Sequence, residues 1–126
     1  MLENAPSFRF QKAERLTHKK LIKELFADGS FFRCAPLQFK WLQKEGLISH
    51  QLLISVPKKL HKRATDRNLL KRRIRETYRL NKHFLPQDRF ALIAIIYQSK
   101  EIETFREIED KLIKGIKRLS LSINES

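Results

Sequence analysis

A long apolar run near the C-terminus places the strongest constraint on the fold. The segment "RFALIAIIYQS" (89–99) is rich in β-branched and other apolar residues and shows no alternation with polar ones. A strand with one face in water would alternate, so the run predicts a central strand covered on both faces. At 126 residues the chain is long enough for one domain with a real core.

Helix and strand patterns precede this run. Apolar residues in "RLTHKKLIKELFADG" (15–29) recur at mostly three- to five-residue spacings, which predicts an amphipathic helix ending near Gly29. Alternation in "APLQFKWLQ" (35–43) predicts a half-buried strand, with Phe39 and Trp41 in the core. A second strand follows in "LISHQLLISV" (47–56).

Two further helices complete the pattern. Thr65 or Asp66 is a plausible N-cap for a helix that runs from Arg67 to about Phe84, before Pro86. The last helix carries one apolar stripe, with charges on its other side. The stripe comprises Phe105, Ile108, Leu112, Ile113, Ile116 and Leu119.

The predicted order is therefore α-β-β-α-β-α, with room for a short extra strand. This order indicates an α/β (α+β) sandwich in which helices pack on a small mixed sheet. We expect a single domain over residues 1–126, with flexible ends at about 1–7 and 120–126.

Positive charge is concentrated in the middle of the chain. The formal net charge is +13, and residues 58–82 hold eleven Lys or Arg against two acids, whereas residues 84–126 are balanced. Such a block indicates a binding surface for an anionic partner, most often a nucleic acid. On a helical wheel with Arg67 at zero, Asn68, Lys71, Arg72, Arg75 and Arg79 all fall within an arc of roughly 140°, opposite most of the apolar residues. Arg73 falls within the apolar arc, so it must snorkel or pair.

Several function classes are disfavoured. Cys34 is the only cysteine, the four histidines lack ligand spacing, and no acid pair suits general acid–base catalysis. We therefore expect no catalytic residue and no metal site in the protein. No signal peptide or membrane-spanning run is apparent, which predicts a cytoplasmic protein without membrane contact. The absence of helix-turn-helix, zipper and finger patterns favours RNA over duplex DNA.

The central segment resembles a known family. "SVPKKLHKRATDRNLLKRRIRETYR" (55–79) is similar to the signature of the bacterial ribonuclease P protein subunit, in which a strand ending in Lys-Lys leads to Arg-Asn, Lys-Arg and Arg-Glu pairs in one register. "RFQKAERLTHKKLIKELFADG" (9–29) resembles the family's opening, and the last strand and helix occupy the family's positions. The resemblance covers nearly the whole chain.

This resemblance implies a fold and a function. It implies an α/β sandwich with the basic helix in a left-handed crossover between parallel strands, whereas about 98% of such crossovers are right-handed. It also implies the accessory subunit of a ribonucleoprotein endonuclease, a hydrolase, that removes the 5′ leader from precursor tRNA. In that enzyme Mg²⁺ is held mainly by the RNA subunit, and no obligate protein partner is expected.

The resemblance also implies site residues. The predicted contacts to the RNA subunit are Lys58, Lys59, Arg63, Arg67, Asn68, Lys71, Arg72, Arg75 and Arg79. The predicted leader-binding cleft contains Phe10, Lys12, Arg15, Ile22 and Phe26. Two positions depart from the family pattern. Leu69 replaces an arginine, so that one cationic contact is either missing or supplied by Arg63 or Arg73, and Ile22 replaces an aromatic residue. The alternatives are a structural RNA-binding protein of ribosomal type, an autonomous nuclease and a membrane-surface helix.

Overall fold

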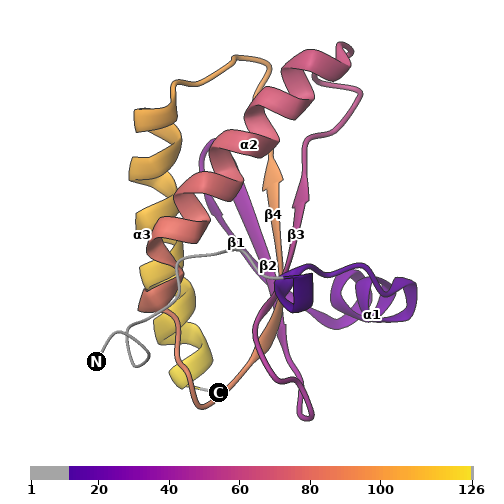
Figure 1. The fold of residues 1–126 in the computed structure, drawn as a ribbon, viewed down its shortest axis with the longest axis vertical. Coiled ribbons are helices and arrows are strands. Elements are labelled where there is room, and N and C mark those ends of the chain that lie inside the picture. Colours follow the sequence, from indigo (N-terminus) through magenta and orange to yellow (C-terminus); the bar gives the residue numbers. More distant parts are fainter. Residues whose placement is uncertain (1–11, 126) are drawn as a thin grey trace.

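The computed structural model describes residues 12–125, and its centre is a four-stranded sheet (Figure 1). The strands are β1 (Ser30–Cys34), β2 (Leu37–Gln43), β3 (Gln51–Ser55) and β4 (Ala91–Tyr97), in the spatial order β1-β2-β4-β3. β2 pairs antiparallel with β1 and β4, and β3 pairs parallel with β4, so the sheet is mixed as predicted.

β4 is the predicted central strand. Ile93 and Ile95 point into the main core, and Leu92 and Ala94 point into a smaller cluster on the other face; none of the four is exposed. Both faces are therefore covered, which is the reason that the sequence of β4 does not alternate.

Three helices cover the sheet. α2 (Ala64–Asn81) and α3 (Phe105–Asn124) pack together on one face, over the main core. α1 (Lys19–Asp28) lies on the other face, against β2 and β4. Two short 3₁₀ turns, η2 (Lys12–Glu14) and η3 (Lys82–Phe84), precede α1 and follow α2. Of the helices in this part of the chain, none is long and apolar enough to cross a bilayer.

The connection from β3 through α2 to β4 is left-handed. In Figure 1 both strands point upward, α2 passes in front of the sheet, and β4 lies to the left of β3. This agrees with the family resemblance and departs from the common rule for parallel crossovers.

The elements differ from the prediction at several boundaries. β1 supplies an extra edge strand, and β3 begins only at Gln51. α2 begins at Ala64, and its N-cap is Arg63 without a side-chain capping bond, so Thr65 and Asp66 are not the cap. Sequence reasoning missed the Thr104–Glu107 capping box that starts α3.

The last helix continues beyond its predicted end near Leu119. α3 runs to Asn124, because Ile123 extends the apolar stripe and is fully buried. Arg89 Nη1 also donates a hydrogen bond to the Asn124 carbonyl at 3.2 Å. Flexibility of residues 120–126 remains a prediction, and residues 1–7 lie outside the described part.

Candidate nucleic-acid interface

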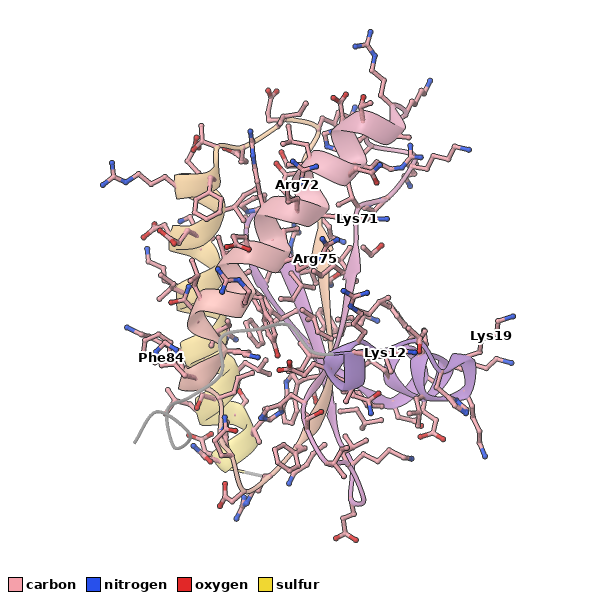
Figure 2. The ribbon with its side chains drawn as sticks, in the orientation of Figure 1. Lys12, Lys19, Lys71, Arg72, Arg75 and Phe84 are labelled. Atoms are coloured by element: carbon pink, nitrogen blue, oxygen red, sulfur yellow. The ribbon has the colours of Figure 1, made fainter. Side chains whose placement is uncertain are left out.

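The solvent side of α2 presents the predicted cationic stripe. Leu70 and Ile74 are fully buried, so the opposite side of the helix faces outward. Asn68, Arg72 and Arg75 are exposed and Lys71 is half-buried. Figure 2 labels three of these side chains along α2. We call the four residues Asn68, Lys71, Arg72 and Arg75 the α2 stripe.

Other basic residues of this helix are held within the protein. Arg67 Nη1 donates to the carbonyls of His61 and Lys62 at 2.9 and 2.8 Å, which fixes the loop before α2. Arg73 Nη1 donates to the Glu103 carbonyl, so the prediction that Arg73 must snorkel or pair is confirmed. These two guanidinium groups thus stabilise loops on either side of α2.

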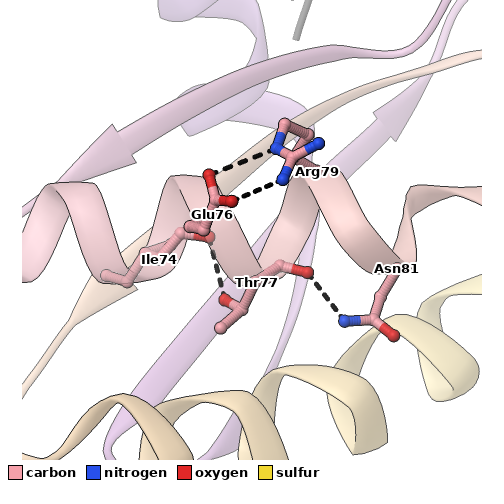
Figure 3. A network of polar contacts seen from close by, with 5 residues as sticks. All are labelled: Ile74, Glu76, Thr77, Arg79 and Asn81. Atoms are coloured by element: carbon pink, nitrogen blue, oxygen red, sulfur yellow. Dashed lines mark hydrogen bonds and ion pairs between the residues drawn. The ribbon is translucent and has the colours of Figure 1, made fainter. Parts of the chain in front are cut away.

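Arg79 is paired along the helix (Figure 3). Its Nε lies 3.2 Å from Glu76 Oε2, and a second bond joins Nη2 to Oε1. The pairing lowers the pKa of the Glu76 carboxyl and raises the pKa of Arg79. A neighbouring carboxylate therefore partly offsets the charge of Arg79, whereas within residues 12–125 no ion pair of this kind involves Lys71, Arg72 or Arg75. Below this pair, Thr77 Oγ1 donates to the Ile74 carbonyl and Asn81 Nδ2 to the Thr77 carbonyl, at 2.9 and 2.8 Å.

The loop between β3 and α2 extends the positive surface. Lys58, Lys59 and Arg63 are all exposed. A turn at Pro57, whose carbonyl accepts from the amide of His61 at 3.2 Å, shapes the loop. The His61 ring is buried, and its Nε2 lies 2.6 Å from the Ser99 carbonyl. The loop therefore has a fixed base from which the three cations project.

A second surface lies on the α1 side of the sheet. Phe26 of α1 is 40% exposed, and Lys40 Nζ from β2 lies 4.9 Å from its ring centroid. Phe31 of β1 is 63% exposed and stands opposite Lys40 in the strand register, with Nζ 6.0 Å from its ring. A lysine thus lies between two exposed aromatic rings, an arrangement suited to bases and phosphates of a single strand.

The sheet beside this group is only partly covered. Strand alternation puts residues on the α1 side that do not join the α1 cluster and are exposed or half-buried. We call this set the open sheet face: Phe31, Arg33, Gln38, Lys40, Gln51, Ser55 and Ile96. Sequence reasoning leaves Phe31 undecided, because its exposure depends on the register of β1 against β2.

Other predicted cleft residues lie in different settings. Ile22 is half-buried and packs against the cluster of Leu25 and Leu92, so it contributes mainly to the core. Lys12 and Arg15 are exposed on the segment before α1. Phe10 lies outside the described residues. As predicted, the aromatics of β2 belong to the core: Phe39 is fully buried, and Trp41 packs beside it.

The segment carrying Lys12 and Arg15 runs along the edge of β3. Arg15 forms a parallel bridge with Leu52, and the Leu16 amide donates to the Leu52 carbonyl at 2.9 Å. Nearby, Glu14 accepts hydrogen bonds from Lys82 Nζ at 2.8 and 3.0 Å. Figure 2 labels Lys12 on the short turn η2, which precedes α1.

Residues 12–125 contain no group of three or more His, Cys, Asp or Glu that could hold a metal ion. The buried His50 accepts from the Ala91 amide at Nδ1 and meets the Pro86 carbonyl at Nε2, at 3.1 and 2.6 Å. Burial lowers the pKa of His50. Cys34 Sγ donates to the Lys111 carbonyl at 3.3 Å. These side chains serve the fold.

Comparison with known proteins identifies the family. The model of the family described as Ribonuclease P matches residues 10–120. A ribonuclease P protein component from Porphyromonas gingivalis is 36% identical over 132 residues, covering 99% of this chain and 96% of the relative. One from Aliivibrio fischeri is 34% identical over 116 residues, covering 90% and 97%.

Solved structures agree with the sequence match. The RNase P protein from Thermotoga maritima superposes with a TM-score of 0.71 at 28% identity, covering 83% of this chain and 96% of that one. The Staphylococcus aureus RNase P protein superposes with a TM-score of 0.74 at 22% identity, covering 89% and 99%, and supports the fold. From its sequence and its fold, the chain belongs to the ribonuclease P protein family.

Proposed function

We propose that this ribonuclease P subunit assists its RNA partner through two separate surfaces. The α2 stripe, together with Lys58, Lys59 and Arg63, binds the RNA subunit. The open sheet face and Phe26 hold the single-stranded 5′ leader of precursor tRNA. The observation that carries the proposal is the presence of two exposed cationic surfaces on opposite faces of one sheet.

The chemistry of each surface fits its proposed strand. Guanidinium groups of the α2 stripe can form paired hydrogen bonds to phosphate oxygens, which suits a large folded RNA. Phe26 and Phe31 offer faces on which bases of any sequence can stack, with Lys40 beside them for phosphate. A leader differs in sequence from one precursor to the next, so a sequence-tolerant surface is required there.

Arg67 and Arg79 take a smaller part in RNA binding than the family resemblance implies. Arg67 is engaged with two backbone carbonyls, and Arg79 with Glu76. We assign Arg67 to positioning the loop that carries Lys58 and Lys59. Lys12 and Arg15 would guide the leader where it passes the edge of β3.

Hydrolysis would be carried out by Mg²⁺ bound to the RNA subunit. The protein residues described do not form a metal cluster of their own, so we assign them to binding and positioning. Because transcripts are processed where they are made, we propose a cytoplasmic location, with no membrane contact and no obligate protein partner.

The test is cleavage of a labelled precursor tRNA at low Mg²⁺ by a bacterial ribonuclease P RNA alone, by this protein alone and by the two together. We expect cleavage at the mature 5′ end only in the mixture. Cleavage by the protein alone would indicate an autonomous nuclease. Failure of the mixture with the cognate RNA would leave a structural RNA-binding protein.

A further inference from the structure

The end of α2 carries an exposed aromatic pair that the proposed function does not use. Phe84, in η3, is 40% exposed. The His83 ring contacts it at a centroid distance of 4.4 Å and a tilt of 35°. From α3, Lys117 Nζ lies 5.1 Å from the centroid of Phe84. Figure 2 places Phe84 at the far end of α2 from Arg72.

This group has the same geometry as the pair on the other face. Phe26 is also 40% exposed, and its lysine ammonium lies 4.9 Å from the ring. In both places the lysine comes from a neighbouring element, so tertiary packing creates the pair. An aromatic ring beside a lysine ammonium is an arrangement to which single-stranded nucleic acid binds.

Packing of the core does not account for the position of Phe84. A continuous α-helix would direct this residue to the apolar side of α2. Instead the chain tightens at Lys82 into a 3₁₀ turn, which changes the rotation per residue, and the next residue, Leu85, enters the core with 2% exposure. Phe84 is thereby left at the surface.

Charge around the pair favours an anion. The acids of α3 all lie at or before Asp110, whereas the rest of the helix, up to Asn124, carries basic groups and no acid. The basic residues are Lys111, Lys114, Lys117 and Arg118. Residues 84–126 carry no net charge as a whole. Within α3, however, the acidic residues lie toward the N-terminal end and most of the basic residues toward the C-terminal end. The basic part adjoins Phe84 through Lys117.

We propose that His83, Phe84 and Lys117 form a further contact for an unpaired nucleotide of the RNA subunit. A base stacks on the exposed part of the His83–Phe84 pair, and the Lys117 ammonium moves from the ring to the adjoining phosphate. The proposal rests on the proposed function for the identity of the RNA.

The first test is binding of fluorescein-labelled U12 RNA, followed by anisotropy at low salt, to the full chain carrying Phe26→Ala, so that the proposed leader surface contributes less to the binding that is measured. Phe84→Leu keeps an apolar side chain and removes the stacking face, so we expect about tenfold weaker binding. Lys117→Gln should weaken binding and lower the salt slope by about 0.7, the value for one phosphate of a single strand that is no longer neutralised. Equal affinity of the Phe26→Ala chain with and without Phe84→Leu would overturn the proposal.

Phe105→Leu is the matched control. Phe105 is 36% exposed on the same helix as Lys117, but lies between Glu103 and Glu107 in sequence. We expect its replacement to leave U12 binding unchanged. Thermal unfolding of each variant separates weakened binding from a damaged fold. A loss in Phe105→Leu equal to that in Phe84→Leu would show a general effect on folding and contradict the assignment.

The second test uses the RNA subunit itself. Crosslinking from 5-iodouridine placed in its unpaired segments should mark the peptide that contains Phe84, and Phe84→Leu should weaken the complex. Weaker binding to U12 with unchanged binding to the RNA subunit would overturn the choice of partner. A different result would contradict the proposed function, namely that the unsubstituted protein and the ribonuclease P RNA together do not cleave precursor tRNA.

Discussion

Two arginines on α2, Arg67 and Arg72, have different tasks. Arg72 is exposed, so Arg72→Ala should preserve the free energy of unfolding but weaken binding to the RNA subunit. The slope of the logarithm of the binding constant against the logarithm of the salt concentration should fall by about 0.7 to 0.9 for each phosphate that is no longer neutralised. Arg67→Ala removes two hydrogen bonds to carbonyls and should cost about 1–3 kcal/mol of stability. Urea unfolding and filter binding at several salt concentrations distinguish the two. Similar losses of stability in Arg67→Ala and Arg72→Ala would contradict this assignment of different tasks.

Phe26 is assigned to the leader. Because this ring is exposed and its neighbour Leu25 fills the core, Phe26→Ala should leave the fold intact. It should weaken binding of precursor tRNA by about 1–3 kcal/mol, the value of one stacked base, without changing the binding of mature tRNA. Phe105→Ala serves as the exposed aromatic control. An equal effect on both tRNA forms would remove Phe26 from the leader site.

His50 gives the protein a defined pH dependence. Its Nδ1 accepts the Ala91 amide hydrogen, so the neutral ring with a proton on Nε2 is the folded form, and burial lowers the pKa below the usual 6.5. The unfolded chain therefore binds the proton more readily, and stability is full above about pH 6.5 and falls as pH decreases toward the folded-state pKa. Urea unfolding between about pH 5 and 7 should show this slope. His50→Gln should flatten it, and an unchanged slope in this variant would assign the pH dependence to another group.

At the scale of elements, α3 approaches the sheet most closely at a glycine. A Cβ at Gly115 would lie 2.2 Å from ring atoms of Phe39, which is fully buried and cannot move aside. Although alanine favours helix, Gly115→Ala should lower the free energy of unfolding by about 1–3 kcal/mol through overpacking. Thermal or urea unfolding measures the change. Arg106→Ala, at an exposed position of the same helix, should have a small effect, and a stabilised Gly115→Ala would show that α3 can shift.

Periodicity predicts most elements because each buries one continuous stripe or run. β4, α1 and α3 are of this kind, and their existence is clear from the sequence. The start of α2 is not predictable in this way, because Arg67 holds the preceding loop through carbonyls of His61 and Lys62, an interaction without a local capping signal. The left-handed crossover could be expected only from the family resemblance, since chain physics favours the other hand.

The candidate site is predictable in part for the same reason. The α2 stripe follows from helical spacing alone. The partners of Arg79 and Ile22, and the exposure of Phe31 and Phe84, depend on tertiary packing and strand register. A phenylalanine in a sequence usually indicates core, and only the folded chain separates the buried Phe39 from its exposed counterparts.

At the scale of the whole molecule, the ion pair of Glu14 and Lys82 joins the start of the described chain to the end of α2. Both side chains are largely shielded from water, with exposures of 14% and 13%. Glu14→Gln removes the charge of the carboxylate that accepts two hydrogen bonds from Lys82 Nζ, and should cost about 1.5–3 kcal/mol. Urea unfolding measures this. The exposed pair Asp110–Lys114 provides the control, since Asp110→Asn should change stability by less than about 1 kcal/mol.

The backbone pairing of Arg15 and Leu16 with Leu52 has a consequence for solubility. β3 is an edge strand, and an uncovered edge offers free amides and carbonyls to any extended chain that approaches. The segment before α1 occupies part of this edge. The opposite edge, β1, is five residues long and carries Arg33. Neither edge of the sheet therefore offers a long, uncharged strand with which another chain could pair, and this protects the protein from aggregation through edge-strand pairing.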